Sequence, residues 1–503
     1  MNTMRWWKVA ALLAAAAFSR CAPAQPPVAA SFPVFNVMSF GAKNDDSAPA
    51  TGAFQNAIAA AKKAGGGTIF VPAGRYTSGP IVLFSNMTLQ LDAGATITFP
   101  VAPLPFVQGR YLGVEALVPM PLVGGDHVEN VAISGRGTLV TGDYAAWGRA
   151  YGRPAASARD DSGNANGPLW DHLLKALNAG QPVSGSDYRA AATELRPSFI
   201  CFSNAKNILI AGVHLVGGPA FVVHLLYSEN ATVRNVVIDA YPGPHANGIV
   251  VDSSRFVRIA DDFVDTGDDG IVIKAGKDAD GLRVSRPSED VAITNCTVKH
   301  AHGAVVIGSE TSGGIGNVVA SNIAADGAEN GIRIKSRRGR GGVVQNVRFD
   351  NWTMRNVGTG IAITTYYVMG GEGATAEEKV SRRTPVFQNI GISNITIAGA
   401  RQVADIEGLP EMPLRGVRLL NVIGEGRTGL VAESADNLEL HDVKIATRQS
   451  PAYRLRSITN LLLDDVGANP ASASAPAIRI ENCPGAVLRN NPTPRIATQG
   501  KTQ

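Results

Sequence analysis

Charged residues are scarce in this chain of 503 residues, where they make up 17% of the sequence and leave a formal net charge of only +4. So small a charge gives no electrostatic basis for nucleic-acid binding. A hydrophobic share of 45% excludes general disorder. The 55 glycines follow no three-residue period, which excludes collagen. The length allows either a few domains or one repetitive domain.

Cysteine is also scarce, with four residues in the chain. Cys21 lies in the N-terminal segment, and the other three, Cys201, Cys296 and Cys483, are far apart in the sequence. An odd number at such distances matches neither a disulfide framework nor a metal-binding spacing. We therefore expect buried apolar thiols, and we expect neither a metal nor a cofactor.

No apolar run near the N-terminus is long enough to span a bilayer. The run from Val9 to Phe18 follows Arg5 and Lys8 and precedes the small residues 22–24. A basic start, a short apolar stretch and a small-residue exit are typical of a secretory signal peptide, here residues 1–24. We expect an exported protein, periplasmic or extracellular, without membrane attachment once the signal is removed.

The rest of the chain repeats a short string in which Asn or Asp precedes two aliphatic residues separated by one position. Between residues 207 and 346 these strings begin 23 to 34 residues apart, and Phe256 takes the place of the Asn in one of them. The period is too short for propeller blades, and the leucine frame of leucine-rich repeats is absent. The strings begin at Asn207, Asn230, Asp290, Asn317, Asn346, Asn389, Asn437 and Asn460.

Such a repeat of short β-prone segments predicts an all-β fold, a right-handed parallel β-helix that forms one domain over residues 25–503 and is expected to be monomeric. Asn side chains at the turns can form ladders between coils. Residues 51–64 have the amphipathic pattern of a helix that caps the N-terminal end. Residues 141–195 interrupt the repeat, and we expect a long loop insertion that borders the binding site.

Four polar motifs are separated by about one coil each. Asn247, Asp268, His302 and Arg333 lie 21, 34 and 31 residues apart. Residues in this phase stack on one face of a β-helix, and three steps of roughly 4.8 Å span only about 15 Å. The motifs should therefore form one polar patch.

The chemistry of that patch favours hydrolysis of an acidic sugar polymer. Adjacent carboxylates such as Asp268 and Asp269 are expected to raise one another's pKa, so that one can donate a proton while the other activates water. Arg333 and Lys335 point to the same side of a strand and are candidates for holding a substrate carboxylate. Alone, an Asp-Asp pair usually lies in a solvated turn. The one-coil spacing that it shares with the other motifs is what favours a catalytic site.

The same residues resemble glycoside hydrolase family 28, the polygalacturonases. The resemblance is carried by GDDGIVIK, the HG of HAHGAVVIGSE and the RIK of IRIKSRRGRGG, together with the early segments FNVMSFGA, GGGTIFVPAGRY and TLQLDAGATI. It implies an inverting hydrolase that acts on pectin or galacturonan, the acidic polysaccharides of plant cell walls. The segments VVIGSETSGG and SRRGRGG are more similar to the bacterial exo-acting members than to the fungal endo-acting enzymes.

The resemblance also implies roles for individual residues. Asp268 would be the general acid and Asp269 the base, and His302 would tune the acid. Arg333 and Lys335 would hold a substrate carboxylate. The TTYY segment would place Tyr366 or Tyr367 near the subsite.

The sequence departs from the family pattern at the first motif, where HANGIV has Asn247 and Val250 in place of two aspartates. An amide can orient a water molecule but cannot deprotonate it at neutral pH. Three hypotheses follow: Asp269 acts as the sole base, Asp252 is recruited as a second base, or the protein binds pectin fragments without cutting them. A pectate lyase with Ca²⁺ is a further alternative on the same fold.

Overall fold

The computed structural model describes residues 33–499 apart from 152–166, 244, 369–375, 470–474 and 493–494. The expected signal segment 1–24 and residues 25–32 lie outside the described residues. None of the helices within the described ranges is long and apolar enough to cross a membrane.

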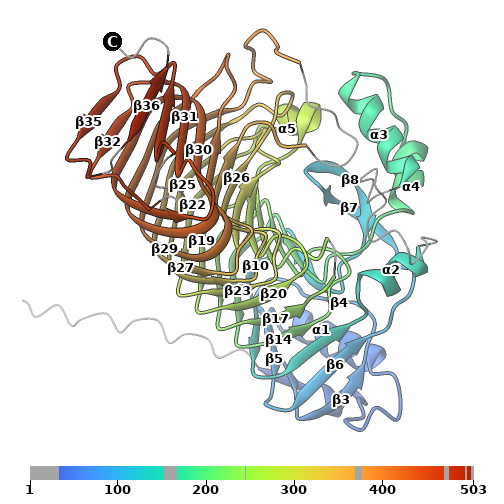
Figure 1. Cartoon of the computed structure of the whole chain (residues 1–503). Helices are drawn as coiled ribbons and strands as arrows, with labels where there is room; N and C mark the ends of the chain where they lie inside the picture. Colours follow the sequence, from blue (N-terminus) through green and yellow to red (C-terminus); the bar gives the residue numbers. More distant parts are fainter. Residues whose placement is uncertain are drawn as a thin grey trace, which may run out of the picture. The chain divides into compact units, whose positions relative to one another are not determined.

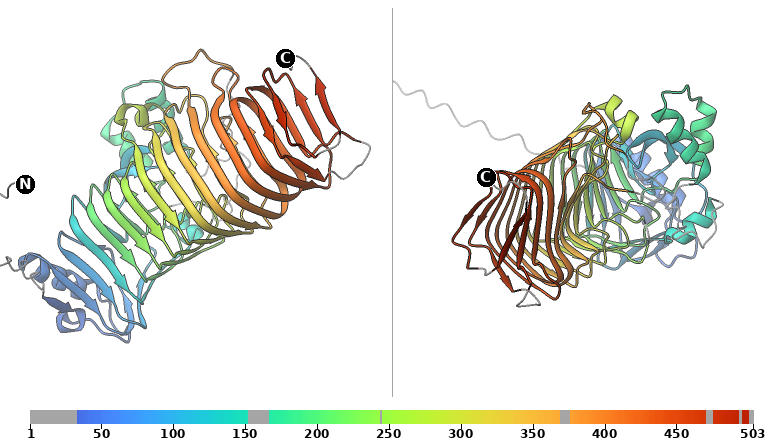
Figure 2. Two further views of the ribbon diagram at one scale, coloured as in Figure 1. Left: turned by 90° about the vertical axis from the view of Figure 1, so that its left-hand side faces the viewer. Right: turned by 45° about the horizontal axis from the view of Figure 1, so that its top comes forward.

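The strands stack coil on coil in parallel (Figures 1 and 2). Every strand pair between described residues is parallel except one hairpin, which consists of β7 (Phe106–Tyr111) and β8 (Val114–Pro119). Each coil contributes up to three strands separated by turns. Equivalent strands of successive coils lie side by side, so the strands form three parallel stacks. The predicted all-β parallel β-helix is therefore confirmed.

The first stack contains the Asn/Asp–aliphatic strings. It runs through β1 (Val34–Asn36), β2 (Gly67–Val71), β5 (Met87–Leu91), β10 (Glu129–Gly135), β13 (Lys206–Ala211), β16 (Glu229–Arg234), β19 (Arg255–Ala260), β22 (Ser288–Thr294), the first parts of β25 (Ile315–Asp326), β27 (Val343–Arg355), β29 (Val386–Glu407) and β30 (Leu414–Thr447), then β32 (Leu462–Asp464) and β35 (Val487–Arg489).

The second stack follows the first after a corner of two or three residues where the strands are separate. It runs through β3 (Gly74–Thr77), β6 (Ala95–Phe99), β11 (Thr138–Thr141), β14 (His214–Val216), β17 (Val237–Ala240), β20 (Phe263–Thr266) and β23 (Thr297–Lys299), continues in later parts of β25, β27, β29 and β30, and ends with β33 (Gly467–Asn469).

The third stack carries the candidate site and is called the groove face below. It runs through β4 (Ile81–Val82), β9 (Val123–Asp126), β12 (Ile200–Ser203), β15 (Val223–Leu226), β18 (Ile249–Asp252), β21 (Ile271–Lys274), β24 (Val305–Gly308), β26 (Asn330–Lys335), β28 (Thr359–Thr364), further parts of β29 and β30, β31 (Tyr453–Thr459), β34 (Ile478–Glu481) and β36 (Ile496–Gln499).

The core is a set of aliphatic columns inside the coils. Ile249, Ile271, Val305 and Ile332 stack in register along the groove face, and each is fully buried. Burying one such side chain contributes about 1.5–3 kcal/mol. The three cysteines expected to be buried thiols, Cys201, Cys296 and Cys483, are free and buried in the structure.

Asparagine ladders lie at the corner before each string, as predicted. In one ladder the Asn207 amide donates to Asn130 at 2.8 Å, and the Asn230 amide donates to Asn207 at 2.7 Å. These residues have positive φ, near 56°, a conformation that asparagine tolerates better than most residues do. Phe256 occupies the next position in the ladder, also at φ 56°.

A helix covers the N-terminal end of the coils, as the sequence predicts. Helix α1 (Thr51–Lys63) turns Phe54, Ala57 and Ile58 toward the core and ends with Lys62 and Lys63 in its last turn. The cationic last turn complements the helix dipole. A 3₁₀ helix, η1 (Val37–Phe40), lies beside it.

The excursion over residues 141–195 is more ordered than the expected loop. Its described part contains three helices, α2 (Tyr144–Ala150), α3 (Pro168–Asn178) and α4 (Gly185–Ala192). Helices α3 and α4 pack on the β7–β8 hairpin through a small apolar cluster that includes Tyr111, Trp170 and Leu195 (Figure 1). The excursion is therefore a helical buttress for the hairpin.

Candidate active site

The four polar motifs lie on consecutive coils of the groove face. Asn247 precedes β18, Asp268 and Asp269 precede β21, His302 precedes β24, and Arg333 and Lys335 lie on β26. The register of these strands is continuous, with Ile249 opposite Ile271, Ile271 opposite Val305 and Val305 opposite Ile332. The structure thus brings the predicted residues into one patch.

Asp268 is the centre of the patch and accepts contacts from three side chains. The Asn247 amide nitrogen donates to its Oδ2 at 3.0 Å. His302 Nδ1 lies 3.3 Å from its Oδ1, and His245 Nδ1 lies 3.6 Å from its Oδ2. The backbone N–H of Asp269 also donates to Oδ1 at 2.8 Å. The side chain of Asp268 remains 15% exposed, so a substrate can reach it.

These contacts overturn the expected pKa shift. Burial by itself would raise the pKa of Asp268, but the hydrogen bonds and positive charges of His245 and His302 outweigh it and hold that pKa well below the usual range. In turn, the hydrogen bond and charge of Asp268 raise the pKa of His302. The expectation that the two neighbouring aspartates raise one another's pKa is therefore wrong for Asp268, because two imidazoles lie closer to its charge.

Asp269 is buried and pairs on the groove face with the cationic residues two coils away. Lys335 Nζ lies 2.8 Å from Asp269 Oδ2, and Arg333 Nη1 lies 3.9 Å from Asp269 Oδ1. Asp269 Oδ1 and Asn247 Oδ1 are both buried and have no hydrogen-bond partner in the described structure. The two residues are also in register on adjacent coils. Buried oxygens of this kind need a donor, and a water molecule can supply it.

The two predicted clamp residues differ in their surroundings. Lys335 is buried, and its ammonium is engaged with Asp269, so it holds a carboxylate of the protein. The side chain of Arg333 is 18% exposed and lies at the surface of the groove. Of the two, Arg333 is the one whose guanidinium faces an incoming anion.

Of the two tyrosines in the TTYY segment, Tyr367 lies beside the clamp. The Arg333 guanidinium is 5.3 Å from the centre of the Tyr367 ring, and Lys335 Nζ is 5.0 Å from it. Tyr366 instead lies beside Arg338, whose guanidinium is 5.2 Å from that ring. Of the two candidates, Tyr367 and not Tyr366 is therefore the residue beside Arg333, because consecutive residues of an extended segment face opposite ways.

Asp252 is not available as a second base. Its Oδ1 lies 2.8 Å from Arg110 Nη1, and its Oδ2 lies 3.6 Å from His224 Nε2, with all three side chains buried. Burial alone would raise the pKa of Asp252, but the charge of Arg110 and the contact with His224 lower it to about 2. Asp252 is therefore a buried ion-pair partner, and the hypothesis that it replaces the missing aspartate is rejected.

Sequence reasoning missed several residues of the site. The sequence motifs assign no role to His245, although its position two residues before Asn247 could have suggested contact with the next coil. Lys274 and Glu310 form a buried pair at 2.9 Å on the groove face, and no motif predicted it. The β7–β8 hairpin was also missed, since its residues do not follow the repeat.

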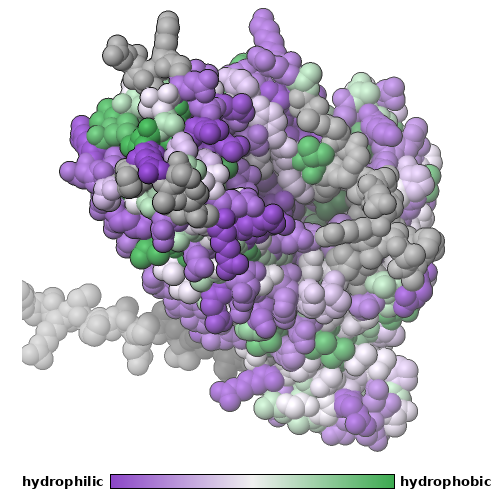
Figure 3. Space-filling view, in the orientation of Figure 1, coloured by the Kyte–Doolittle hydropathy of each residue, from purple (hydrophilic) through white to green (hydrophobic). Residues whose placement is uncertain are grey.

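Exposure changes along the groove face. On the N-terminal coils the outward-facing side chains are each at most 1% exposed, although they point away from the core: His224, Val250, Val272 and Val306. From Arg333 onward the outward side chains reach solvent, and Arg454 is exposed. The surface on the side viewed in Figure 3 is mostly hydrophilic, with apolar residues in small separate groups. The groove is therefore covered on its N-terminal side and open toward the C-terminus.

Two family models match the chain. Residues 183–422 match the model for glycosyl hydrolases family 28. This part of the chain belongs to that family. Residues 34–103 match a second model, described as rhamnogalacturonase A/epimerase, pectate lyase-like. The family 28 region contains every residue of the predicted catalytic patch.

Curated relatives of this chain include polygalacturonases. It is 28% identical over 401 residues to a probable polygalacturonase of Vitis vinifera, which covers 77% of this chain and 73% of that protein. It is also 28% identical to an exo-poly-alpha-D-galacturonosidase of Dickeya chrysanthemi. That match covers 75% of this chain but only 64% of the Dickeya protein, less than two thirds of its length.

Among solved structures, an exopolygalacturonase of Thermotoga maritima is 29% identical, with a TM-score of 0.67. The match covers 87% of this chain and 91% of that chain. Both the fold and the polygalacturonase-like character of the family 28 region thus agree with what the sequence motifs imply.

Proposed function

We propose that the chain is an exported glycoside hydrolase that cleaves galacturonate-containing pectic polysaccharide by inverting acid/base hydrolysis. The observation that carries the proposal is the cluster of Asp268, Asp269, Asn247, His302 and Arg333 on adjacent coils. The relatives, a probable polygalacturonase and two exo-acting galacturonan hydrolases, support the same substrate class. The basic and apolar pattern of residues 1–24 supports export.

In the proposed mechanism Asp268 protonates the oxygen of the departing sugar. At mildly acidic pH His302 Nδ1 carries the proton that it shares with Asp268 Oδ1, because the pKa of His302 is raised and that of Asp268 is lowered, and Asp268 relays it to the substrate. The leaving oxygen takes this proton as the glycosidic bond breaks. His245 and Asn247 position the carboxylate of Asp268.

Asp269 is the proposed base. A water molecule held between Asp269 Oδ1 and Asn247 Oδ1 would satisfy both buried oxygens, and Asp269 would accept its proton as it attacks the anomeric carbon. Lys335 fixes the orientation of Asp269 through its ion pair. Arg333, beside Tyr367, would pair with a uronate carboxylate of the substrate.

We also propose that cleavage occurs near a chain end. The groove face is covered over the N-terminal coils and open toward the C-terminus, so a polymer can extend from the site in one direction only. The exo-acting relatives support cleavage near a chain end.

The test is product analysis on polygalacturonate, rhamnogalacturonan and short galacturonate oligomers, each with and without a chelator. Hydrolysis yields new reducing ends without ultraviolet absorbance and is insensitive to the chelator. Unsaturated products that disappear with the chelator would identify a lyase. Saturable binding of oligogalacturonate without any new reducing ends would identify a binding protein and contradict the proposal.

A further inference from the structure

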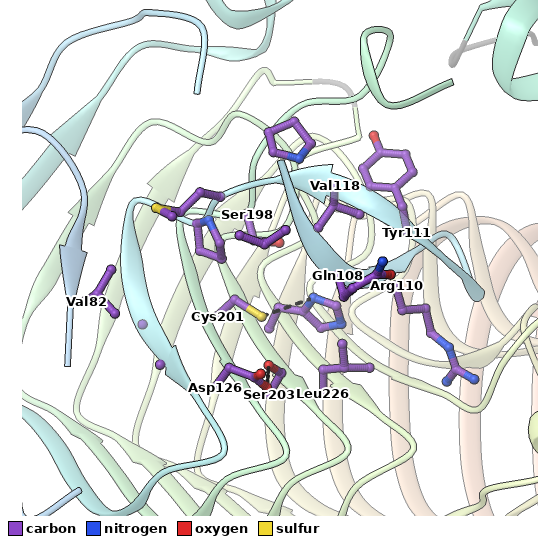
Figure 4. A pocket seen from close by; sticks show the side chains of 18 of the residues that line it. Val82, Gln108, Arg110, Tyr111, Val118, Asp126, Ser198, Cys201, Ser203 and Leu226 are labelled. Atoms are coloured by element: carbon purple, nitrogen blue, oxygen red, sulfur yellow. Dashed lines mark hydrogen bonds between the residues drawn. The ribbon is translucent and has the colours of Figure 1, made fainter. Parts of the chain in front are cut away.

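The β7–β8 hairpin lies over the N-terminal half of the groove face. Leu112 at its tip packs on Phe221, Val250, Val272 and Val306, which form a separate apolar cluster outside the coils. Between the hairpin and strands β9, β12 and β15 lies a cavity of about 210 Å³ (Figure 4). In that view the hairpin residues Gln108 and Val118 lie above Cys201, Ser203 and Leu226. The hairpin is therefore the element that covers the groove.

A buried ion pair joins this hairpin to the strand that follows Asn247. Arg110 on β7 donates through Nη1 to Asp252 Oδ1 at 2.8 Å and to Ser253 Oγ at 2.7 Å. The guanidinium also lies 4.6 Å from the centre of the Tyr227 ring. Both charged side chains are 1% exposed. Since Asp252 is the last residue of β18, the pair fixes the hairpin to the coil that contributes Asn247.

The hairpin tip has further contacts, and these lead to a different element. The backbone N–H of Lys277 donates to Gly113 O at 2.8 Å, and the N–H of Glu115 donates to Asp280 Oδ2 at 2.9 Å. Asp280 belongs to helix α5 (Asp278–Val284). These bonds attach the tip to residues 277–280, whereas the Arg110–Asp252 pair attaches β7 to the groove face itself.

A buried ion pair contributes little net stability to a fold, because the desolvation of two charges offsets most of their attraction. Replacing such a pair by apolar residues of similar size is often neutral for the stability of the fold, but it removes the directional contacts. Here Nη1 of Arg110 donates to both Asp252 and Ser253, and these two bonds set the depth and register of β7.

We propose that Arg110 and Asp252 are specificity-determining residues: their ion pair holds the hairpin against the groove face, so that the substrate chain must end there and is cut near its end. The inference rests on the proposed function and adds residues that touch neither the water nor the scissile bond. Loss of the pair should let the hairpin lift and a polymer pass through.

The experiment compares the full-length wild type with the Arg110→Met, Asp252→Leu double variant, which leaves no unpaired buried charge. Polygalacturonate is digested to a few per cent conversion, and product sizes are measured together with the loss of viscosity per reducing end. The wild type should give one short product size from the start. The double variant should give a spread of longer oligomers early and a severalfold larger viscosity loss per bond cut.

Arg258→Met is the matched control, because Arg258 is an exposed arginine on β19 in the first stack, where its guanidinium donates to Asn230 Oδ1 at 3.2 Å. It should keep the wild-type products. Should the double variant fail to fold, Arg110→Lys keeps the charge on a shorter side chain that loses the guanidinium contact with Tyr227 and no longer reaches both Asp252 and Ser253, and it should shift the products in the same direction by a smaller amount.

The outcomes separate this inference from the proposed function. A folded double variant with wild-type product sizes, or a folded Arg110→Lys variant with no shift, overturns the role of the ion pair and leaves the hydrolase proposal intact. A wild type that releases no reducing ends overturns the hydrolase proposal itself, and the inference falls with it.

Discussion

At the scale of single residues, Asn247 is the feature that distinguishes this site from the family pattern. Its amide nitrogen donates to Asp268 and helps to keep that carboxylate ionised, while its oxygen accepts no bond from the protein. An aspartate at this position would replace a donor by a negative charge. That charge would favour the protonated form of Asp268 and add a second base beside Asp269.

We therefore expect Asn247→Asp to raise the hydrolysis rate by roughly 10-fold, less than the 10²- to 10⁴-fold of a sole general base, because Asp269 is already present. It should also extend activity to higher pH. In the wild type the shared proton is present below the raised pKa of His302 and is lost as the pH rises through it, so activity falls on the alkaline side. The kcat/KM profile of the two proteins measures both effects. A folded variant with unchanged rate and profile would contradict the assigned water site.

Arg333 gives a second prediction at this scale. Its side chain is partly exposed beside Tyr367, whereas Lys335 is engaged with Asp269. Arg333→Ala should raise KM for galacturonate oligomers by about 10- to 100-fold, the equivalent of one lost charge-assisted bond, with a smaller change in kcat. Neutral oligomers of the same length serve as the control. Equal losses for charged and neutral oligomers would exclude a carboxylate clamp.

At the scale of elements, the asparagine ladder explains why the repeat is visible in the sequence. Each string must begin with a residue that tolerates positive φ and bonds to the coil before it, so Asn recurs at a fixed place. Phe256 breaks the rule. It keeps the same φ, is 43% exposed, and lies between Asn230 and Asp290 in register.

Phe256→Asn should therefore raise the free energy of unfolding by about 1 kcal/mol, because it relieves the strained φ and restores a hydrogen bond between coils. Thermal or denaturant unfolding measures the change. Phe263→Asn is the control: Phe263 is 37% exposed but lies within a strand, so its replacement should give no gain. Equal effects at both positions would refute the ladder argument.

The limits of sequence reasoning also appear at this scale. The strings, helix α1 and the one-coil spacing of Asn247, Asp268 and His302 could be predicted, because each has a period set by the geometry of the coil. The hairpin and helices α3 and α4 have no such period, since they are shaped by contacts with one another. The pKa shift of Asp268 could not be predicted either, because it depends on where the imidazoles of His245 and His302 lie.

At the scale of residues 33–499, the β-helix is uneven along its groove face. The N-terminal coils carry added elements that cover the groove, and the later coils leave it open. A regular solenoid thus provides a catalytic patch at the border between a covered and an open region. In the proposed function this border, and not the patch alone, determines where the polymer is cut.

In the proposed function, Asp268 and Asp269 hydrolyse a galacturonan bond with inversion of configuration. The most direct test is to follow, by NMR, the anomeric signals of the new reducing ends in early digests. The wild type should first release the anomer opposite to the substrate linkage. Asp269→Asn should lower the rate by about 10²- to 10⁴-fold while leaving the fold intact. Retained configuration in the first products, or wild-type turnover by a folded Asp269→Asn variant, would contradict the account.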